Sequence, residues 1–194
     1  MEWGILFMGP VGSGKTEAIK SISDIEVINT DVRATDDVRK LKSHTTVSMD
    51  VGVLHLSGHD KLRLYGAPGQ DRFDFMWDIL LLQAKGVVLL LNHASPDPLA
   101  ELDHYLRAIR ERVPGNGLPM VIGVTHIDEK PERPLRIYED YLRQEKIVFY
   151  GVMPPVIEVD ARLHSHVRSL LLVMVAQLEM AARFPKVTPR LAAR

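Results

Sequence analysis

Apolar and polar residues follow one another along the chain in two patterns, which predict strands and helices in turn. Short apolar runs bounded by Gly, Pro or polar residues are typical of buried strands, and apolar residues three or four apart predict amphipathic helices. We expect strands over residues 2–8, 26–30, 46–56, 61–65, 86–92, 120–125 and 156–159. We expect helices over residues 16–23, 75–84, 98–112, 134–144 and 163–183.

The alternation of strands with helices predicts an α/β fold. Strands that are apolar throughout are typical of a mostly parallel central sheet that is covered by helices on both faces. The segment 46–56 instead alternates apolar and polar residues, which predicts a half-exposed strand joined to the next strand by a hairpin turn at 57–60. We expect the apolar stretches 79–82 and 170–175 to belong to the core. Residues 1–184 are expected to form one domain, and residues 185–194 a flexible tail.

Composition excludes several classes of protein. The 194 residues are 46% hydrophobic and 25% charged, as in a soluble globular protein. A net charge of −1 gives no general attraction to nucleic acid or to an anionic membrane. There is no Cys for disulfides or for prenylation, the N-terminus lacks a signal-peptide pattern, and no apolar run could span a bilayer. We therefore expect a cytoplasmic protein without a covalent membrane anchor or a nucleic acid partner.

A glycine-rich loop between the first strand and the first helix is the strongest chemical signal. It consists of Gly9, Pro10, Val11, Gly12, Ser13, Gly14, Lys15 and Thr16. This is the spacing of a phosphate-binding loop in its strand–loop–helix context, where small residues let backbone N–H groups approach a polyphosphate. Lys15 is placed to contact the β- and γ-phosphates, and the Thr16 hydroxyl to ligate Mg²⁺. The sequence therefore predicts a P-loop NTPase that binds a nucleoside phosphate.

Further polar motifs follow the predicted strands in a fixed order. They are the threonines at 45 and 46, Pro68-Gly69-Gln70, Thr125-His126-Ile127-Asp128, and Asp160-Ala161-Arg162. Together with the phosphate loop, this order resembles the bacterial Ras-like small GTPases. The conservon-type and gliding-motility (MglA-like) GTPases are the most similar groups, and the resemblance extends over residues 3–183.

The resemblance implies roles for the first two motifs. Thr46, or alternatively Thr45, would ligate Mg²⁺ and sense the γ-phosphate. Gly69 would offer its N–H to the γ-phosphate, and Gln70 would orient the attacking water. Where most Ras-like proteins have an Asp that holds Mg²⁺ through water, this chain has Gly66. A neighbouring carboxylate such as Asp31 or Asp50 could replace it.

The last two motifs resemble those that recognise guanine. In such GTPases the Asp of Asn/Thr-Lys-x-Asp accepts hydrogen bonds from guanine N1 and N2, a role that would fall to Asp128. Thr125 matches the pattern, whereas the usual Lys is His126, whose ring could stack on the base. The Ala161 N–H would meet guanine O6, with Arg162 in place of a Lys.

The resemblance implies a Ras-like GTPase domain that acts as a switch with GTP or GDP, Mg²⁺ and a Roadblock-domain partner. Val11 stands where Ras has Gly, which predicts slow intrinsic hydrolysis. The arginines at 33, 39 and 72 are candidate arginine fingers, although solvated loop arginines are the commoner case. Two alternatives stay open: a pseudo-GTPase scaffold that holds nucleotide without turnover, and an ATP-dependent P-loop kinase.

Overall fold

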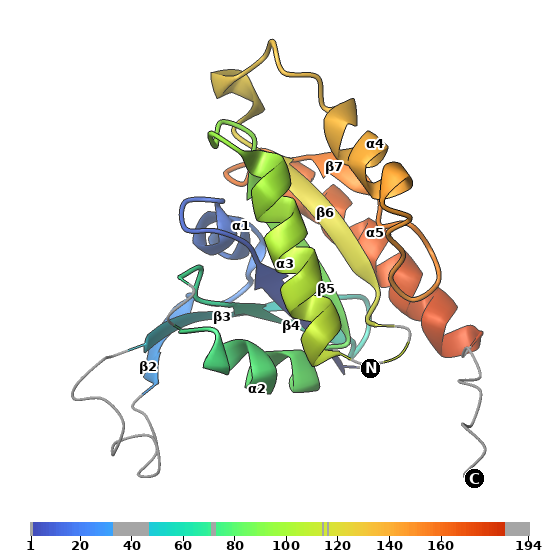
Figure 1. The fold of residues 1–194 in the computed structure, drawn as a ribbon. Coiled ribbons are helices and arrows are strands. Elements are labelled where there is room, and N and C mark those ends of the chain that lie inside the picture. Colours follow the sequence, from blue (N-terminus) through green and yellow to red (C-terminus); the bar gives the residue numbers. More distant parts are fainter. Residues whose placement is uncertain (1, 33–46, 71–72, 114, 116, 185–194) are drawn as a thin grey trace, which may run out of the picture.

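The computed structural model describes residues 2–32, 47–70, 73–113, 115 and 117–184, and Figure 1 shows its fold. The strands are β1 (Glu2–Met8), β2 (Ile28–Val32), β3 (Val47–His55), β4 (Lys61–Gly66), β5 (Gly86–Asn92), β6 (Met120–Thr125) and β7 (Val156–Glu158). The α-helices are α1 (Lys15–Ile22), α2 (Phe75–Gln83), α3 (Pro98–Arg112), α4 (Arg136–Gln144) and α5 (His164–Arg183). A short 3-10 helix covers Ile127–Glu129.

The strands form one mostly parallel sheet in the order β2-β3-β4-β1-β5-β6-β7. β1 pairs in parallel with β4 and β5, and β6 and β7 continue the parallel part of the sheet. β3 is antiparallel to both β2 and β4. The predicted α/β architecture is confirmed, and it is consistent with a P-loop NTPase fold. The carboxyl ends of the parallel strands meet at one edge, where open α/β sheets bind ligands.

Two apolar cores fill the space between the sheet and its helices. One contains buried side chains of α2, α3 and α4, and the other contains buried side chains of α1 and α5. Along β1, Leu6 and Met8 belong to the first core, while Ile5 and Phe7 belong to the second. This alternation explains why the strand is apolar throughout, because both of its faces are covered (Figure 1). No helix in the described part of the chain is long and apolar enough to cross a membrane.

The prediction that the stretches 79–82 and 170–175 are entirely core was wrong. Leu80 and Leu81 are buried in α2, but Ile79 is 57% exposed and Leu82 is 84% exposed. In α5, Leu172 is 59% exposed although its neighbours Leu170 and Leu171 are buried. Successive residues of a helix point about 100° apart, so four consecutive apolar residues cannot all face the same sheet.

The two faces of α5 make a matched test of packing. Leu170 is fully buried, so Leu170→Ala leaves a cavity and should lower the free energy of unfolding by about 2–5 kcal/mol. Leu172→Ala removes the same atoms from the exposed face of the same helix, and should change the free energy of unfolding by less than about 0.5 kcal/mol. Urea denaturation of both variants measures the difference. Equal losses of unfolding free energy would contradict the assignment of Leu170 to the buried face of α5 and of Leu172 to its exposed face.

Candidate functional site

The phosphate loop (residues 9–16) connects β1 to α1 and has the backbone of a phosphate cradle. Gly9, Gly12 and Gly14 have φ values of 137°, 78° and 88°, a region that favours glycine. A Cβ on Gly9 would lie 2.0 Å from the carbonyl oxygen of Leu90, so no side chain fits there. The loop is therefore pressed against β5 and presents its backbone N–H groups at the start of α1, the arrangement that binds anions.

Lys15 is the buried cation of this loop. Its side-chain Nζ donates hydrogen bonds to the carbonyl oxygens of Gly9, at 2.8 Å, and Pro10, at 2.7 Å. Burial lowers the pKa of Lys15 to about 8, and the negative charge of Asp50 only partly opposes this shift. A positive charge held by neutral carbonyls in a buried position favours an anionic ligand. The geometry therefore supports the predicted role of Lys15 as a phosphate contact.

Asp50 places a carboxylate beside Thr16. The Thr16 hydroxyl donates a 2.5 Å hydrogen bond to Asp50 Oδ2. In the antiparallel pairing of β3 with β4, Asp50 lies directly opposite Gly66. A Cβ on Gly66 would be 3.2 Å from Asp50 Oδ2, so this carboxylate occupies the space where a side chain of residue 66 would begin.

The residues around Thr16 suit a hard cation. A cavity of about 290 Å³ is lined by Lys15, Thr16 and Asp50 together with segments 11–12 and 66–69. Hydroxyl and carboxylate oxygens are the donors that Mg²⁺ prefers. Among the residues that the structure describes, no three His, Cys, Asp or Glu side chains gather as a metal site. The groups that the described residues offer an ion beside Lys15 are the Thr16 hydroxyl and the Asp50 carboxylate.

The Pro-Gly-Gln segment lies against the phosphate loop. A Cβ on Gly69 would fall 2.7 Å from the Val11 nitrogen and 2.9 Å from the Gly9 oxygen, so only glycine allows this approach. The Gln70 side chain is exposed beside it, as is Val11. The structure thus brings the Pro-Gly-Gln segment and the phosphate loop into close contact.

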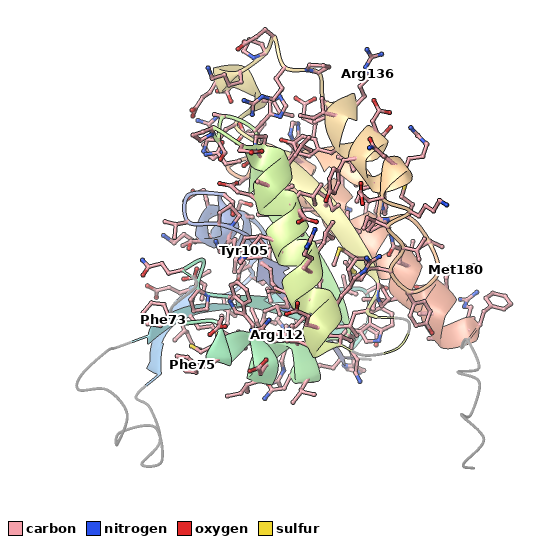
Figure 2. The ribbon with its side chains drawn as sticks, viewed as in Figure 1. Phe73, Phe75, Tyr105, Arg112, Arg136 and Met180 are labelled. Atoms are coloured by element: carbon pink, nitrogen blue, oxygen red, sulfur yellow. The ribbon has the colours of Figure 1, made fainter. Side chains whose placement is uncertain are left out.

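Two aromatic side chains hold the same segment from behind. Trp77 of α2 is 1% exposed, and its Nε1 donates a 3.0 Å hydrogen bond to the Pro68 carbonyl. Tyr105 of α3, labelled in Figure 2, donates from its hydroxyl to the Gly69 carbonyl at 3.2 Å. Sequence patterns did not reveal these residues as part of the site, because both sit at ordinary core positions of their helices.

Thr125 links the predicted base-recognition residues to the phosphate loop. Its hydroxyl lies 3.2 Å from the Ser13 carbonyl oxygen, to which it can donate, and 2.8 Å from His126 Nδ1. A Cβ on Gly14 would lie 3.0 Å from the Ala161 Cβ and 3.7 Å from the Thr125 Cγ2. The phosphate loop, the end of β6 and the segment after β7 therefore meet at one point, as the order of motifs predicts.

Charged side chains surround the outer rim of this point. The Arg162 guanidinium binds Asp160 through two hydrogen bonds, from Nε at 2.9 Å and from Nη2 at 2.8 Å. These bonds lower the pKa of Asp160 to about 2. The hydrogen bonds and the negative charge of Asp160 in turn raise the pKa of Arg162, and the negative charge of Asp128 raises it further. Asp128 is exposed at this rim, so its carboxylate is accessible to a ligand.

Some predicted residues lie outside the described residues. These are Thr45, Thr46 and the candidate arginines at 33, 39 and 72, and the side chain of Asp31. Their roles stay predictions. One further residue was missed although its position offered a signal: His93 directly follows the apolar strand β5, at the edge of the sheet where ligands bind.

The lowered pKa of Lys15 predicts how stability depends on pH. The folded protein holds Lys15 with a pKa of about 8, below the ordinary lysine value of 10.5, so protonation disfavours folding as pH falls through this interval. The free energy of unfolding of the nucleotide-free protein should therefore rise between pH 8 and pH 10.5 by up to about 3 kcal/mol more than that of Lys15→Met. Urea denaturation at several pH values measures this difference. Lys20→Met, at an exposed position of α1, is the control and should show no such trend.

Comparison with known proteins adds a family. No curated protein matches the chain. Residues 7–186, which include the phosphate loop and all the predicted base-recognition residues, match the model of a family described as "Conserved hypothetical ATP binding protein". The match supports nucleotide binding by a P-loop fold, and it does not single out the Ras-like small GTPases. The chain belongs to this family of conserved hypothetical ATP-binding proteins.

Proposed function

We propose that this protein is a GTP-binding molecular switch that hydrolyses GTP slowly. The observation that carries the proposal is the convergence of Thr125 and Ala161 on the phosphate loop, with Asp128 exposed beside them. A bound nucleotide whose phosphates lie on residues 9–16 would have its base at this rim. The family description names ATP, so the choice between the two bases is the first question to test.

The chemistry of the rim favours guanine. A carboxylate such as Asp128 accepts hydrogen bonds only. Guanine offers two donors, N1–H and N2–H, on the edge where adenine presents an acceptor at N1. The Ala161 N–H is a donor suited to guanine O6. An unpaired carboxylate facing adenine would be costly, so this set of groups discriminates between the bases.

We further propose that the switch uses Mg²⁺, held by Thr16, by Thr46 and by the Asp50 carboxylate. Asp50 takes the place of the Asp that Ras-like proteins carry where this chain has Gly66, because the two positions face each other across the β3–β4 pair. When bound, Mg²⁺ would neutralise charge on the β- and γ-phosphates.

Hydrolysis would depend on positioning by the chain. Gln70 would orient a water whose oxygen attacks the γ-phosphorus in line, while the bridging oxygen leaves on GDP. Lys15 would stabilise the charge that develops on the phosphates. Val11 is 65% exposed at the phosphate loop, close to Gly69, where its side chain would restrict the attacking water. This crowding favours slow turnover and keeps the pseudo-GTPase scaffold as the second candidate.

A Roadblock-domain protein remains the proposed activator or effector. The surface we assign to such a partner is the exposed face of α2, which directly follows the Pro-Gly-Gln segment in the chain. Three large apolar side chains lie on it at helical spacing: Phe75, Ile79 and Leu82, which are 42%, 57% and 84% exposed. A partner bound to this face could shift α2. Trp77 of the same helix donates a hydrogen bond to the Pro68 carbonyl, so such a shift would reach the Pro-Gly-Gln segment.

The base preference is tested by titrating nucleotide-free protein with GDP and with ADP in a calorimeter. GDP should bind at least about tenfold more tightly, a difference of roughly 1.4 kcal/mol. Asp128→Ala should remove that preference, because it deletes the acceptor for guanine N1 and N2. Glu129→Ala removes a neighbouring exposed carboxylate of the same 3-10 helix, and should leave the preference intact.

Equal affinity for the two nucleotides, unaffected by Asp128→Ala, would refute the guanine-specific switch. The chain would then be a P-loop nucleotide binder of the kind that its family description names. Tight nucleotide binding with the expected guanine preference, but without phosphate release in the presence of a partner, would favour the pseudo-GTPase scaffold.

The Mg²⁺ role of Asp50 is tested by the dependence of GDP affinity on Mg²⁺ concentration. Asp50→Asn should raise the Mg²⁺ concentration needed for half-maximal effect by about 10–100-fold. The double variant Asp50→Gly/Gly66→Asp moves the carboxylate to the opposing strand. Of the three atoms nearest to the added Cβ, two belong to the Asp50 side chain that is removed and the third is the tip of Ile19. Recovery of Mg²⁺ dependence in the double variant supports the assignment. An unchanged Mg²⁺ dependence in Asp50→Asn contradicts it.

A further inference from the structure

A buried polar cluster lies next to the base-recognition residues. His93 follows β5 and is fully buried. Its Nδ1 is 2.9 Å from the hydroxyl of Tyr138 in α4, and its Nε2 is 3.0 Å from the carbonyl oxygen of Arg133. Tyr138 is also fully buried. Buried polar groups with specific partners fix local geometry, because breaking either hydrogen bond leaves a polar atom unsatisfied.

The partners define how the imidazole is protonated. A carbonyl oxygen only accepts hydrogen bonds, so His93 Nε2 must carry the proton that it donates to Arg133. In a neutral ring Nδ1 is then an acceptor, which matches the Tyr138 hydroxyl as its donor. Burial raises the pKa of Tyr138 to about 12, so the phenol keeps its proton at neutral pH. Both ring nitrogens of a neutral His93 are satisfied in one orientation only.

His93 makes hydrogen bonds to both ends of the loop that carries Asp128. We call residues 125–133 the base-recognition loop. At its start, the His93 backbone N–H donates a 2.9 Å hydrogen bond to the Thr125 carbonyl. At its end, His93 Nε2 donates to the Arg133 carbonyl, and Arg133 Nη1 donates back to the His93 carbonyl at 2.6 Å. Arg133 Nη1 also donates to the Ser95 carbonyl at 2.9 Å.

The loop between these ends is a series of tight turns. Backbone hydrogen bonds join Glu129 to His126 and Lys130 to Ile127, each at 3.2 Å, and Arg133 to Lys130 at 3.1 Å. A displacement of Arg133 is therefore transmitted through consecutive turns to residue 128. Because Asp128 is exposed, its position depends on the path of the backbone and not on packing of its own side chain.

We propose that His93 is the positioning residue of the base-recognition loop: by holding Thr125 and Arg133 it keeps Asp128 in place to bind the nucleotide base. This inference rests on the proposed function in that residues 125–128 contact the base. A loop ordered before binding loses less conformational entropy when the ligand arrives, so the hold on both ends favours base recognition. His93 is fully buried, so it would act through residues 125 and 133 and not by contact with a ligand.

A purely structural role predicts something different. A histidine that only supports the core would, when replaced, weaken all ligand binding in proportion to lost stability. A positioning residue should weaken binding of the base and spare binding of the phosphates. Inorganic pyrophosphate is the matched probe, because it has the same number of phosphates as GDP and lacks the nucleoside.

The first experiment uses Arg133→Met, which removes the hydrogen bonds from the half-buried guanidinium to the carbonyls of His93 and Ser95 and keeps the core intact. The control is Arg136→Met, the same change at the exposed start of α4, where Figure 2 shows the side chain pointing away from the body of the protein. Calorimetry should show GDP affinity about tenfold weaker in Arg133→Met, with pyrophosphate affinity within about twofold of the wild type. Arg136→Met should change neither.

The second experiment compares two replacements of His93 itself. His93→Gln can still donate from its amide to the Arg133 carbonyl, whereas His93→Leu cannot donate at all. The ratio of GDP to pyrophosphate affinity should fall in His93→Leu and should recover at least partly in His93→Gln. Because the measured quantity is a ratio within each variant, a general loss of stability does not imitate the effect.

The proposal is overturned if His93→Leu keeps the wild-type ratio of GDP to pyrophosphate affinity, whether the two affinities stay unchanged or fall together, because this variant removes the donor to the Arg133 carbonyl. It is also overturned if pyrophosphate binds the wild type as tightly as GDP does, because the base then contributes nothing. Failure of the proposed guanine preference looks different. The wild type would then bind ADP as tightly as GDP, and the ratio of nucleotide to pyrophosphate affinity in the His93 variants would still test the role of His93.

Discussion

Burial of the Lys15 ammonium against backbone carbonyls is the interaction on which the rest of the site depends. Taking a cation out of water costs free energy, and neutral carbonyls only partly compensate for it. The lowered pKa of Lys15 expresses this imbalance. The carbonyls that hold the cation come from Gly9 and Pro10, so the same contacts shape the loop. An anion that restored the balance would bind more tightly than it could to an exposed lysine.

The sheet supplies the opposite charge from β3, the strand next to the one that carries Gly66. Asp50 and Gly66 are neighbours only because β3 runs antiparallel to β4 in one register. A slip of one residue would turn the carboxylate to the other face of the sheet, away from Thr16. The position of this carboxylate beside Thr16 is therefore a property of strand pairing and not of one local motif.

Sequence patterns predicted the elements best where the chain itself marks their ends. Gly86–Asn92, Pro98–Arg112 and Met120–Thr125 were predicted at both ends, since glycine, proline or polar residues bound them. α4 begins at Arg136, two residues after the proline at 134 that marked the predicted start, and β2 lies at 28–32 and not at 26–30.

The site was predicted as far as its local motifs reach. The phosphate loop and Thr125 lie together as expected. The position of Asp50 needed the register of two strands, and that of His93 needed contacts with Arg133 and Tyr138, which are 40 and 45 residues away in sequence. The guanine preference stays a prediction. The hydrogen bond from Trp77 to Pro68 has an optical consequence: the loop cannot shift at Pro68 without changing the polarity around a buried indole. The protein thus contains an intrinsic ultraviolet reporter of its own loop position, with no dye attached.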